Sequence, residues 1–162
     1  MTDVKPASRF VSMPAHTYSP ALVAISVVIA CLASYTALDL AGRVTVARAR
    51  NRLTWLLYAS TAMGIGIWSM HFVGMLAFRM SIPVSYDVPL VLSSALIAIA
   101  AALLAMFTVS RAELPMRRLI AAGAIMGIAI AGMHYTGMAA MRMPAALHYD
   151  PQLFSLSIAI AV

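Results

Sequence analysis

The chain of 162 residues is 63% hydrophobic and only 10% charged, and its mean hydropathy is +0.93. Soluble domains average about 45 to 50% apolar and about 25% charged residues. The composition therefore predicts an integral membrane protein and excludes a disordered chain, a disulfide scaffold and a soluble nucleotide-binding domain. The net charge of +6 comes from Arg residues in short stretches between apolar runs. Because they form no continuous basic face, we expect no nucleic-acid partner.

Four apolar runs are long enough to cross a bilayer as helices, since about 20 residues span about 30 Å of hydrocarbon. They fall at residues 20–42, 53–78, 88–109 and 118–141. A fifth run begins at Gln152 and is still apolar at Val162, which predicts a chain cut inside a further helix. The expected fold class is all-α: a polytopic transmembrane helix bundle with four complete spans plus the start of a fifth.

The Arg residues also predict an orientation in the membrane. The loops after the first and third spans carry seven Arg, whereas the other two loops carry only Arg79 and Arg142. By the positive-inside rule, the Arg-rich loops belong in the cytoplasm, with the N-terminal segment 1–17 outside. Asp39, the only acid within a span, is expected to pair with Arg43 one helical turn away.

An internal repeat organises the membrane domain, residues 18–162. Residues 63–87 align without a gap with residues 126–150, and 13 of the 25 pairs are identical. Similar start signals precede the odd-numbered spans, with Ser or Asp expected as a helix N-cap beside a Pro: Tyr18-Ser19-Pro20, Tyr86-Asp87-Val88-Pro89 and Tyr149-Asp150-Pro151. The repeated unit is thus predicted to be a helix pair that starts near residues 18, 86 and 149, with the third unit incomplete.

Each repeat places a His and a Met one turn apart on the same helix face. The pairs are His71 with Met75 and His134 with Met138. Met141 is expected one turn beyond Met138. Met70, Met133 and Met141 are further ligand candidates.

Neutral imidazole and thioether form a soft ligand set that suits copper, particularly Cu(I), and suits Mg²⁺ or Ca²⁺ poorly. An ionisable side chain inside a membrane also indicates function. The competing interpretation is packing, because Met fills irregular gaps and a buried His can hydrogen-bond a neighbouring helix. Packing does not require the same His, Met and Gly at the same offsets twice, so the repetition favours a ligand role.

Other repeated residues have simpler explanations. The Gly residues, including the Gly123-x-x-x-Gly127 pattern, are expected to let helix backbones approach closely, and they could also support a homodimer. Trp68, Phe72 and Tyr135 are expected to be wall or interface residues. Arg79 and Arg142 are expected to reach the outer headgroups or to pair with Asp87 and Asp150.

Two segments, Met70-His71-Phe72-Val73 and Met133-His134-Tyr135-Thr136, resemble the signature of the MHYT family of bacterial integral membrane sensor domains. The resemblance extends to residues 34–40 and covers essentially all of residues 18–162. It implies a sensor of O2, CO or NO that uses copper held by Met and His near the outer face. It also implies three motifs over six or seven spans, and cytoplasmic signalling modules such as those that make or degrade cyclic di-GMP, or a histidine kinase. The first copy departs from the signature at Phe72 and Val73.

The leading hypothesis is a membrane-embedded sensory domain that binds copper and contacts the lipid bilayer. The sequence offers no nucleophile with a base and no paired carboxylates, so we expect no catalysis by this chain. The main alternative is a haem protein for electron transfer or haem-based sensing, with the two His as axial ligands. A third hypothesis is a module that only anchors and dimerises a cytoplasmic domain and binds neither cofactor.

Overall fold

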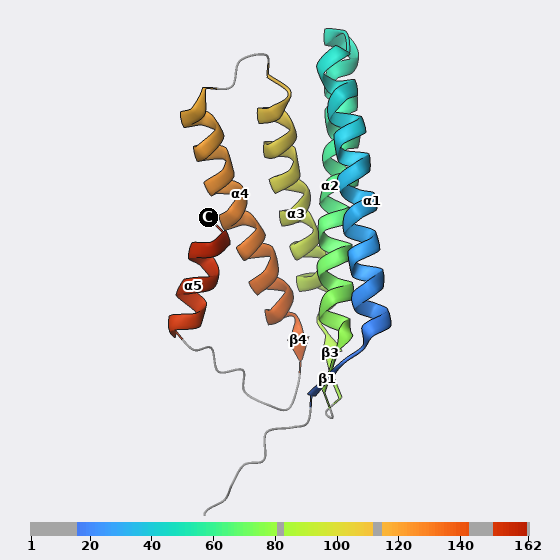
Figure 1. The fold of residues 1–162 in the computed structure, drawn as a ribbon, viewed down its shortest axis with the longest axis vertical. Coiled ribbons are helices and arrows are strands. Elements are labelled where there is room, and N and C mark those ends of the chain that lie inside the picture. The colour runs from blue at the N-terminus through green and yellow to red at the C-terminus, as the bar shows by residue number, and fades with distance from the viewer. Residues whose placement is uncertain (1–15, 81–82, 112–114, 143–150, 162) are drawn as a thin grey trace, which may run out of the picture.

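The computed structural model describes residues 16–80, 83–111, 115–142 and 151–161. Five helices dominate it (Figure 1): α1 (Pro20–Val46), α2 (Ala49–Ala77), α3 (Val88–Val109), α4 (Met116–Ala139) and the short α5 (Pro151–Ala161). By length and composition, α1 to α4 can each cross a membrane. The predicted all-α membrane fold with four complete spans is therefore confirmed. Residues 1–15 of the predicted N-terminal segment lie outside the described residues.

The predicted ends of the spans were wrong by a few residues where Arg is involved. Helix α1 continues to Val46 and α2 already begins at Ala49, so Arg43 and Arg50 lie in helices instead of a loop. Apolar runs end at the first Arg, but the helical backbone does not, because Arg is a good helix former whose long side chain can reach water. The predicted Asp39–Arg43 pair is confirmed, with 2.9 Å between Arg43 Nε and Asp39 Oδ2.

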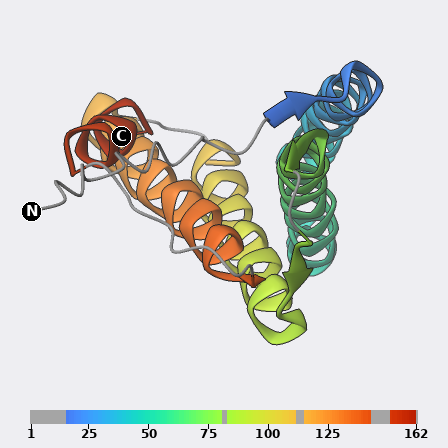
Figure 2. The same ribbon diagram turned by 90° about the horizontal axis from the view of Figure 1, so that it is seen from below.

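The long helices follow one another in an open row in which each packs on the next. Viewed along the helices, α1 and α2 form one arm and α3, α4 and α5 form another, and the two arms diverge (Figure 2). Only 6% of the most apolar stretch of α1 is buried inside the protein, against 33% for α3. Apolar faces of this extent need lipid or further protein to cover them.

Short antiparallel strand pairs, which the sequence analysis did not anticipate, close each helix pair at the same end of the molecule. Strand β1 (His16–Tyr18) pairs with β2 (Phe78–Met80), and Tyr18 lies opposite Phe78. Strand β3 (Ser85–Tyr86) pairs with β4 (Met141–Arg142), and Tyr86 lies opposite Met141. Phe78 and Met141 are equivalent positions of the repeat, so both units end in the same way.

The residues before α1 and α3 continue this pairing. The backbone N–H of Ser19 donates to the carbonyl of Ala77 at 2.9 Å, and that of Asp87 donates to Ala140 at 2.8 Å. The predicted N-cap is confirmed at Asp87, whose side chain accepts from the N–H of Leu90 at 3.3 Å. Ser19 also occupies the predicted N-cap position before Pro20, but its side chain makes no cap bond. Asp150 lies outside the described residues.

Two glycines allow the close helix contacts that the sequence analysis expected. A Cβ on Gly66 would lie 2.3 Å from the Cβ of Ala33 in α1, and one on Gly64 would lie 2.5 Å from the Cα of Ile99 in α3. Neither distance is sterically tolerable. By contrast, a Cβ on Gly123 or Gly132 would meet no atom within 4 Å. Close packing within this chain therefore explains Gly64 and Gly66 but not Gly123 and Gly132 of α4.

An ion pair joins the start of α3 to the end of α4, since the Arg142 guanidinium hydrogen-bonds the Asp87 carboxylate through Nε and Nη2. Of the two alternatives expected for Arg142, pairing with an Asp is the one observed, and the partner is Asp87. The hydrogen bond from Arg142, followed by that from the Leu90 N–H, holds the pKa of Asp87 below its usual value. A lowered carboxyl pKa stabilises the fold above the unfolded value, and this stabilisation is lost as pH falls through the folded value.

We expect Asp87→Asn to lower the thermal midpoint in detergent at about pH 7, and the difference from wild type to shrink and then vanish as pH falls through the lowered pKa of Asp87. Asn keeps the N-cap, so the variant isolates the charge. Arg142→Gln is the matched variant and should behave in the same way. A deficit that stays constant down to acid pH would contradict an ionic origin.

Candidate metal site

The two predicted histidines meet across the helix interface. Nδ1 of His134 in α4 lies 3.1 Å from Nε2 of His71 in α2, which is hydrogen-bond distance. The ring centroids are 4.8 Å apart and the planes are inclined by 74°, so the imidazoles meet edge to face. One ring donates and the other accepts, according to the tautomer. The structure thus brings together the two residues that the repeat singled out.

The fold places this contact near the strand end of the molecule. His71 lies six residues before the end of α2 and His134 five before the end of α4, which is roughly 8 to 9 Å along each helix. Helix α4 is inclined so that its strand end approaches α2, while α3 lies between them along the rest of their length (Figure 1). Strands β3 and β4 hold that end of α4 to the start of α3. The site therefore depends on both repeat units.

Met75 lies beside the same helix contact. A Cβ on Gly137 of α4 would be 3.7 Å from the Met75 sulfur, so this thioether lies against the α4 backbone one turn from His134. The predicted His71–Met75 face of α2 therefore does face α4.

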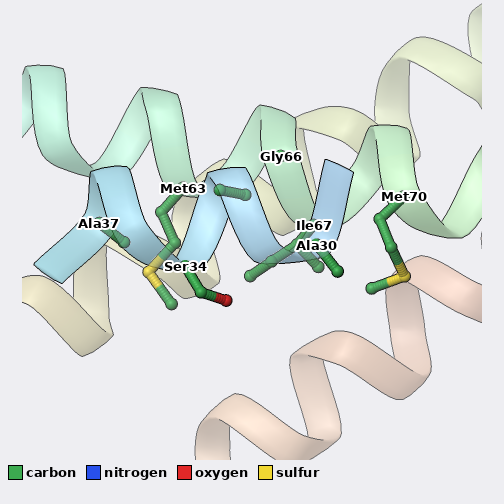
Figure 3. Close-up of a pocket in the computed structure, with 8 residues that line it drawn as sticks. Ala30, Ser34, Ala37, Met63, Gly66, Ile67 and Met70 are labelled. Carbon is green, nitrogen blue, oxygen red and sulfur yellow. The ribbon is translucent and has the colours of Figure 1, made fainter. Parts of the chain in front are cut away.

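Met70 lies on a different side of α2. With Met63 it lines a pocket of about 80 Å³ against α1, together with Ala30, Ala33, Ser34, Ala37, Gly66 and Ile67. In Figure 3 the two thioethers lie toward opposite ends of this row of residues. The Ser26 hydroxyl of α1 donates to the Met70 carbonyl at 2.9 Å and ties this turn of α2 to α1.

The other candidate methionines occupy distinct environments. Met133 is almost fully buried, with 2% of its surface exposed, and Met138 is half-buried. The expectation that Met141 extends the helical face beyond Met138 was wrong. Helix α4 ends at Ala139, and Met141 lies in β4 opposite Tyr86. The helix stops there because the chain turns into the extended pairing with the start of α3.

The aromatic residues near the site contact side chains of neighbouring elements. Trp68 Nε1 donates to the Ser94 hydroxyl of α3 at 3.0 Å, and the rings of Phe72 and Tyr86 are 5.4 Å apart. The Tyr135 hydroxyl lies 2.6 Å from that of Ser157 in α5. These contacts agree with the wall role predicted for Trp68, Phe72 and Tyr135.

The donor set fits a soft metal better than a hard one. In the described part of the chain, no group of three or more His, Cys, Asp or Glu side chains could hold a metal ion. An ion at this place would therefore need the thioethers beside the imidazoles. Imidazole nitrogens bind metals such as zinc at about 2.0 to 2.1 Å, so two of them on one ion are at most about 4 Å apart. The observed 3.1 Å is within that limit.

Sequence reasoning missed the serines that position α2. Ser26 and Ser94 are buried, and through their bonds to Met70 and Trp68 they connect the turn that precedes His71 to α1 and α3. A Ser within an apolar run was the available signal. The sequence could not show which helix each hydroxyl would reach.

Fold and site together define a multi-span helical membrane domain with a histidine pair between two repeat units. The chain belongs to the MHYT family, described as a bacterial signalling protein N-terminal repeat, whose sequence pattern matches residues 9–54, 64–122 and 127–162. It is thus a multi-pass bacterial membrane domain of signalling proteins.

Curated relatives agree with this assignment. The chain is 54% identical over 146 residues to the bifunctional diguanylate cyclase/cyclic di-GMP phosphodiesterase MucR of Pseudomonas aeruginosa. It is 47% identical to the cyclic di-GMP phosphodiesterase NbdA of the same organism and 38% identical to the signaling protein YkoW of Bacillus subtilis. These matches cover 90% of this chain but only 21%, 18% and 18% of those proteins. No solved structure matches the chain.

Proposed function

We propose that this chain is the sensory input domain of a bacterial membrane signalling protein and that it binds copper between α2 and α4. The observation that carries the proposal is the direct contact of His71 and His134 at 3.1 Å, made by the same position of two repeats. Met75 supplies a thioether at the same interface, and Met138 lies one turn beyond His134. Imidazole with thioether is a ligand set that copper accepts and that Mg²⁺ or Ca²⁺ does not.

The geometry favours copper over the haem alternative. Axial ligands of a haem lie on opposite faces of a planar macrocycle. The two imidazoles are instead within hydrogen-bond distance of one another, which leaves no room for a macrocycle between them. A haem would require α2 and α4 to separate.

We further propose that the bound metal senses a diatomic gas, O2, CO or NO, or the redox or metal state of the outer compartment. Gas binding needs one coordination position that is open or held by a labile ligand. Thioethers are weak ligands, so Met75 or Met138 could leave such a position. The relatives MucR and NbdA are named for cyclic di-GMP turnover, so we propose an output of that type beyond this domain.

The helix ends support an orientation in the membrane. Seven Arg lie at the ends of α1 to α4 opposite the strand pairs, against Arg79 and Arg142 at the strand end. The positive-inside rule then places the N-terminus and the histidine pair toward the outer face. A reporter protein that is active only in the cytoplasm should therefore be active when it is fused after Arg50. Activity of a periplasm-dependent reporter at that position would overturn this orientation.

The copper proposal is tested on the purified, folded protein. Elemental analysis should find copper, and the absorption spectrum should lack a Soret band. A Soret band would establish the haem alternative. Protein that binds neither after incubation with Cu(I) would support the third hypothesis, a module that anchors and dimerises a cytoplasmic domain.

A further inference from the structure

Two adjoining pockets lie at the end of the molecule opposite the strand pairs, where the α1–α2 connection meets the end of α3. One, of about 240 Å³, is lined mainly by apolar side chains: Arg52, Leu53, Leu56, Phe107 and Ser110. The other, of about 260 Å³, is lined by Thr45, Ala47, Arg52, Ser110 and Arg111. Because Arg52 and Ser110 line both, the pair forms one amphipathic depression, polar on one side and apolar on the other.

Contacts within the chain hold both arginines in place. Arg52 Nη2 donates to the Ser110 carbonyl at 2.7 Å, which uses one of the five N–H donors of a guanidinium. The Arg111 guanidinium carbon lies 4.5 Å from the centre of the Phe107 ring. A guanidinium that is held in advance loses less side-chain entropy when it binds an anion.

The positive charge of this depression has no counter-charge in the described part of the chain. The described residues include two acids, and each already has a partner elsewhere. Asp39 pairs with Arg43, and Asp87 pairs with Arg142. Arg52 and Arg111 therefore have no acidic partner among the described residues, and they lie beside an apolar pocket at the end of helices that can cross a membrane.

We propose that this depression binds an anionic phospholipid, with the phosphate between Arg52 and Arg111 and an acyl chain along Leu53, Leu56 and Phe107. The planar guanidinium fork matches a phosphate through paired hydrogen bonds. Basic pockets between membrane helices are known to take anionic headgroups. A soluble anion would contact only the polar side of the depression. Because the apolar side could bind an acyl chain, we assign the ligand to a lipid.

The test is lipid retention by the purified protein in detergent, measured by native mass spectrometry with phosphatidylglycerol or phosphatidylcholine. Wild type should retain phosphatidylglycerol in preference to phosphatidylcholine. Loss of one arginine contact should weaken retention about fivefold, so Arg52→Gln and Arg111→Gln should each do so. Arg118→Gln is the matched control, because Arg118 is exposed at the same end but does not line either pocket.

Arg111→Gln removes no helix-to-helix hydrogen bond, so it tests the proposal even if Arg52→Gln fails to fold. Equal retention of the two lipids would overturn the proposal. So would a loss in Arg118→Gln as large as in Arg111→Gln. Inorganic phosphate is the third probe, and release of phosphatidylglycerol by millimolar phosphate would assign the pocket to a soluble anion instead.

Discussion

The double variant His71→Ala with His134→Ala is expected to abolish copper binding, whereas Met75→Leu or Met138→Leu should only weaken it. Each imidazole contributes a nitrogen to the same point between α2 and α4, and thioethers are the weaker ligands. Leu keeps much of the volume of Met, so the packing of the helices changes little. Copper per protein, measured by elemental analysis on monodisperse samples, gives the result directly.

The control must separate ligation from packing, because the histidine contact is also a hydrogen bond between helices. The double variant His71→Gln with His134→Gln restores side chains that can bond one another through amide N–H and carbonyl groups. It should fold like wild type and still lack copper, since soft metals bind amides poorly. Copper at wild-type stoichiometry in both double variants would return the histidines to a packing role.

The second large effect, a loss of stability, is expected from adding one methyl group at the interface between α1 and α2. Gly66→Ala would place a Cβ 2.3 Å from the Cβ of Ala33, so the helices must separate. Overpacking of this kind costs about 1 to 3 kcal/mol. Adding Ala33→Gly removes the opposing Cβ and should restore most of the stability, because the double variant only exchanges the two residues. Thermal unfolding in detergent measures both changes.

Gly123→Ala is the matched control in the same protein. Its Cβ would meet no atom within 4 Å, and alanine is favoured over glycine in a helix by about 1 kcal/mol. This variant should therefore be neutral or stabilising, opposite in sign to Gly66→Ala. The packing explanation of Gly66 would be wrong if both variants had the same effect, or if Ala33→Gly made Gly66→Ala worse.

The sequence alone determined the membrane fold and the residues of interest. Helix number followed from apolar run length, because the hydrocarbon thickness fixes how many residues a span needs. The 63-residue repeat identified His71 and His134 without any coordinates, because identical chemistry at identical offsets is unusual for packing. The Asp39–Arg43 pair followed from helical spacing alone, since residues four apart are neighbours on any helix.

The tertiary structure decided everything that depends on how separate helices meet. No periodicity could show that Met75 faces α4 while Met70 faces α1, since both lie on α2 next to the same histidine. The tertiary structure also determined that Arg142 pairs with Asp87, and that Met141 lies in a strand instead of in α4. Local sequence fixes spacing along one helix, but contacts between helices depend on their inclination and on the strand pairs that close each unit. The histidines therefore touch because α4 crosses toward α2 at the strand end.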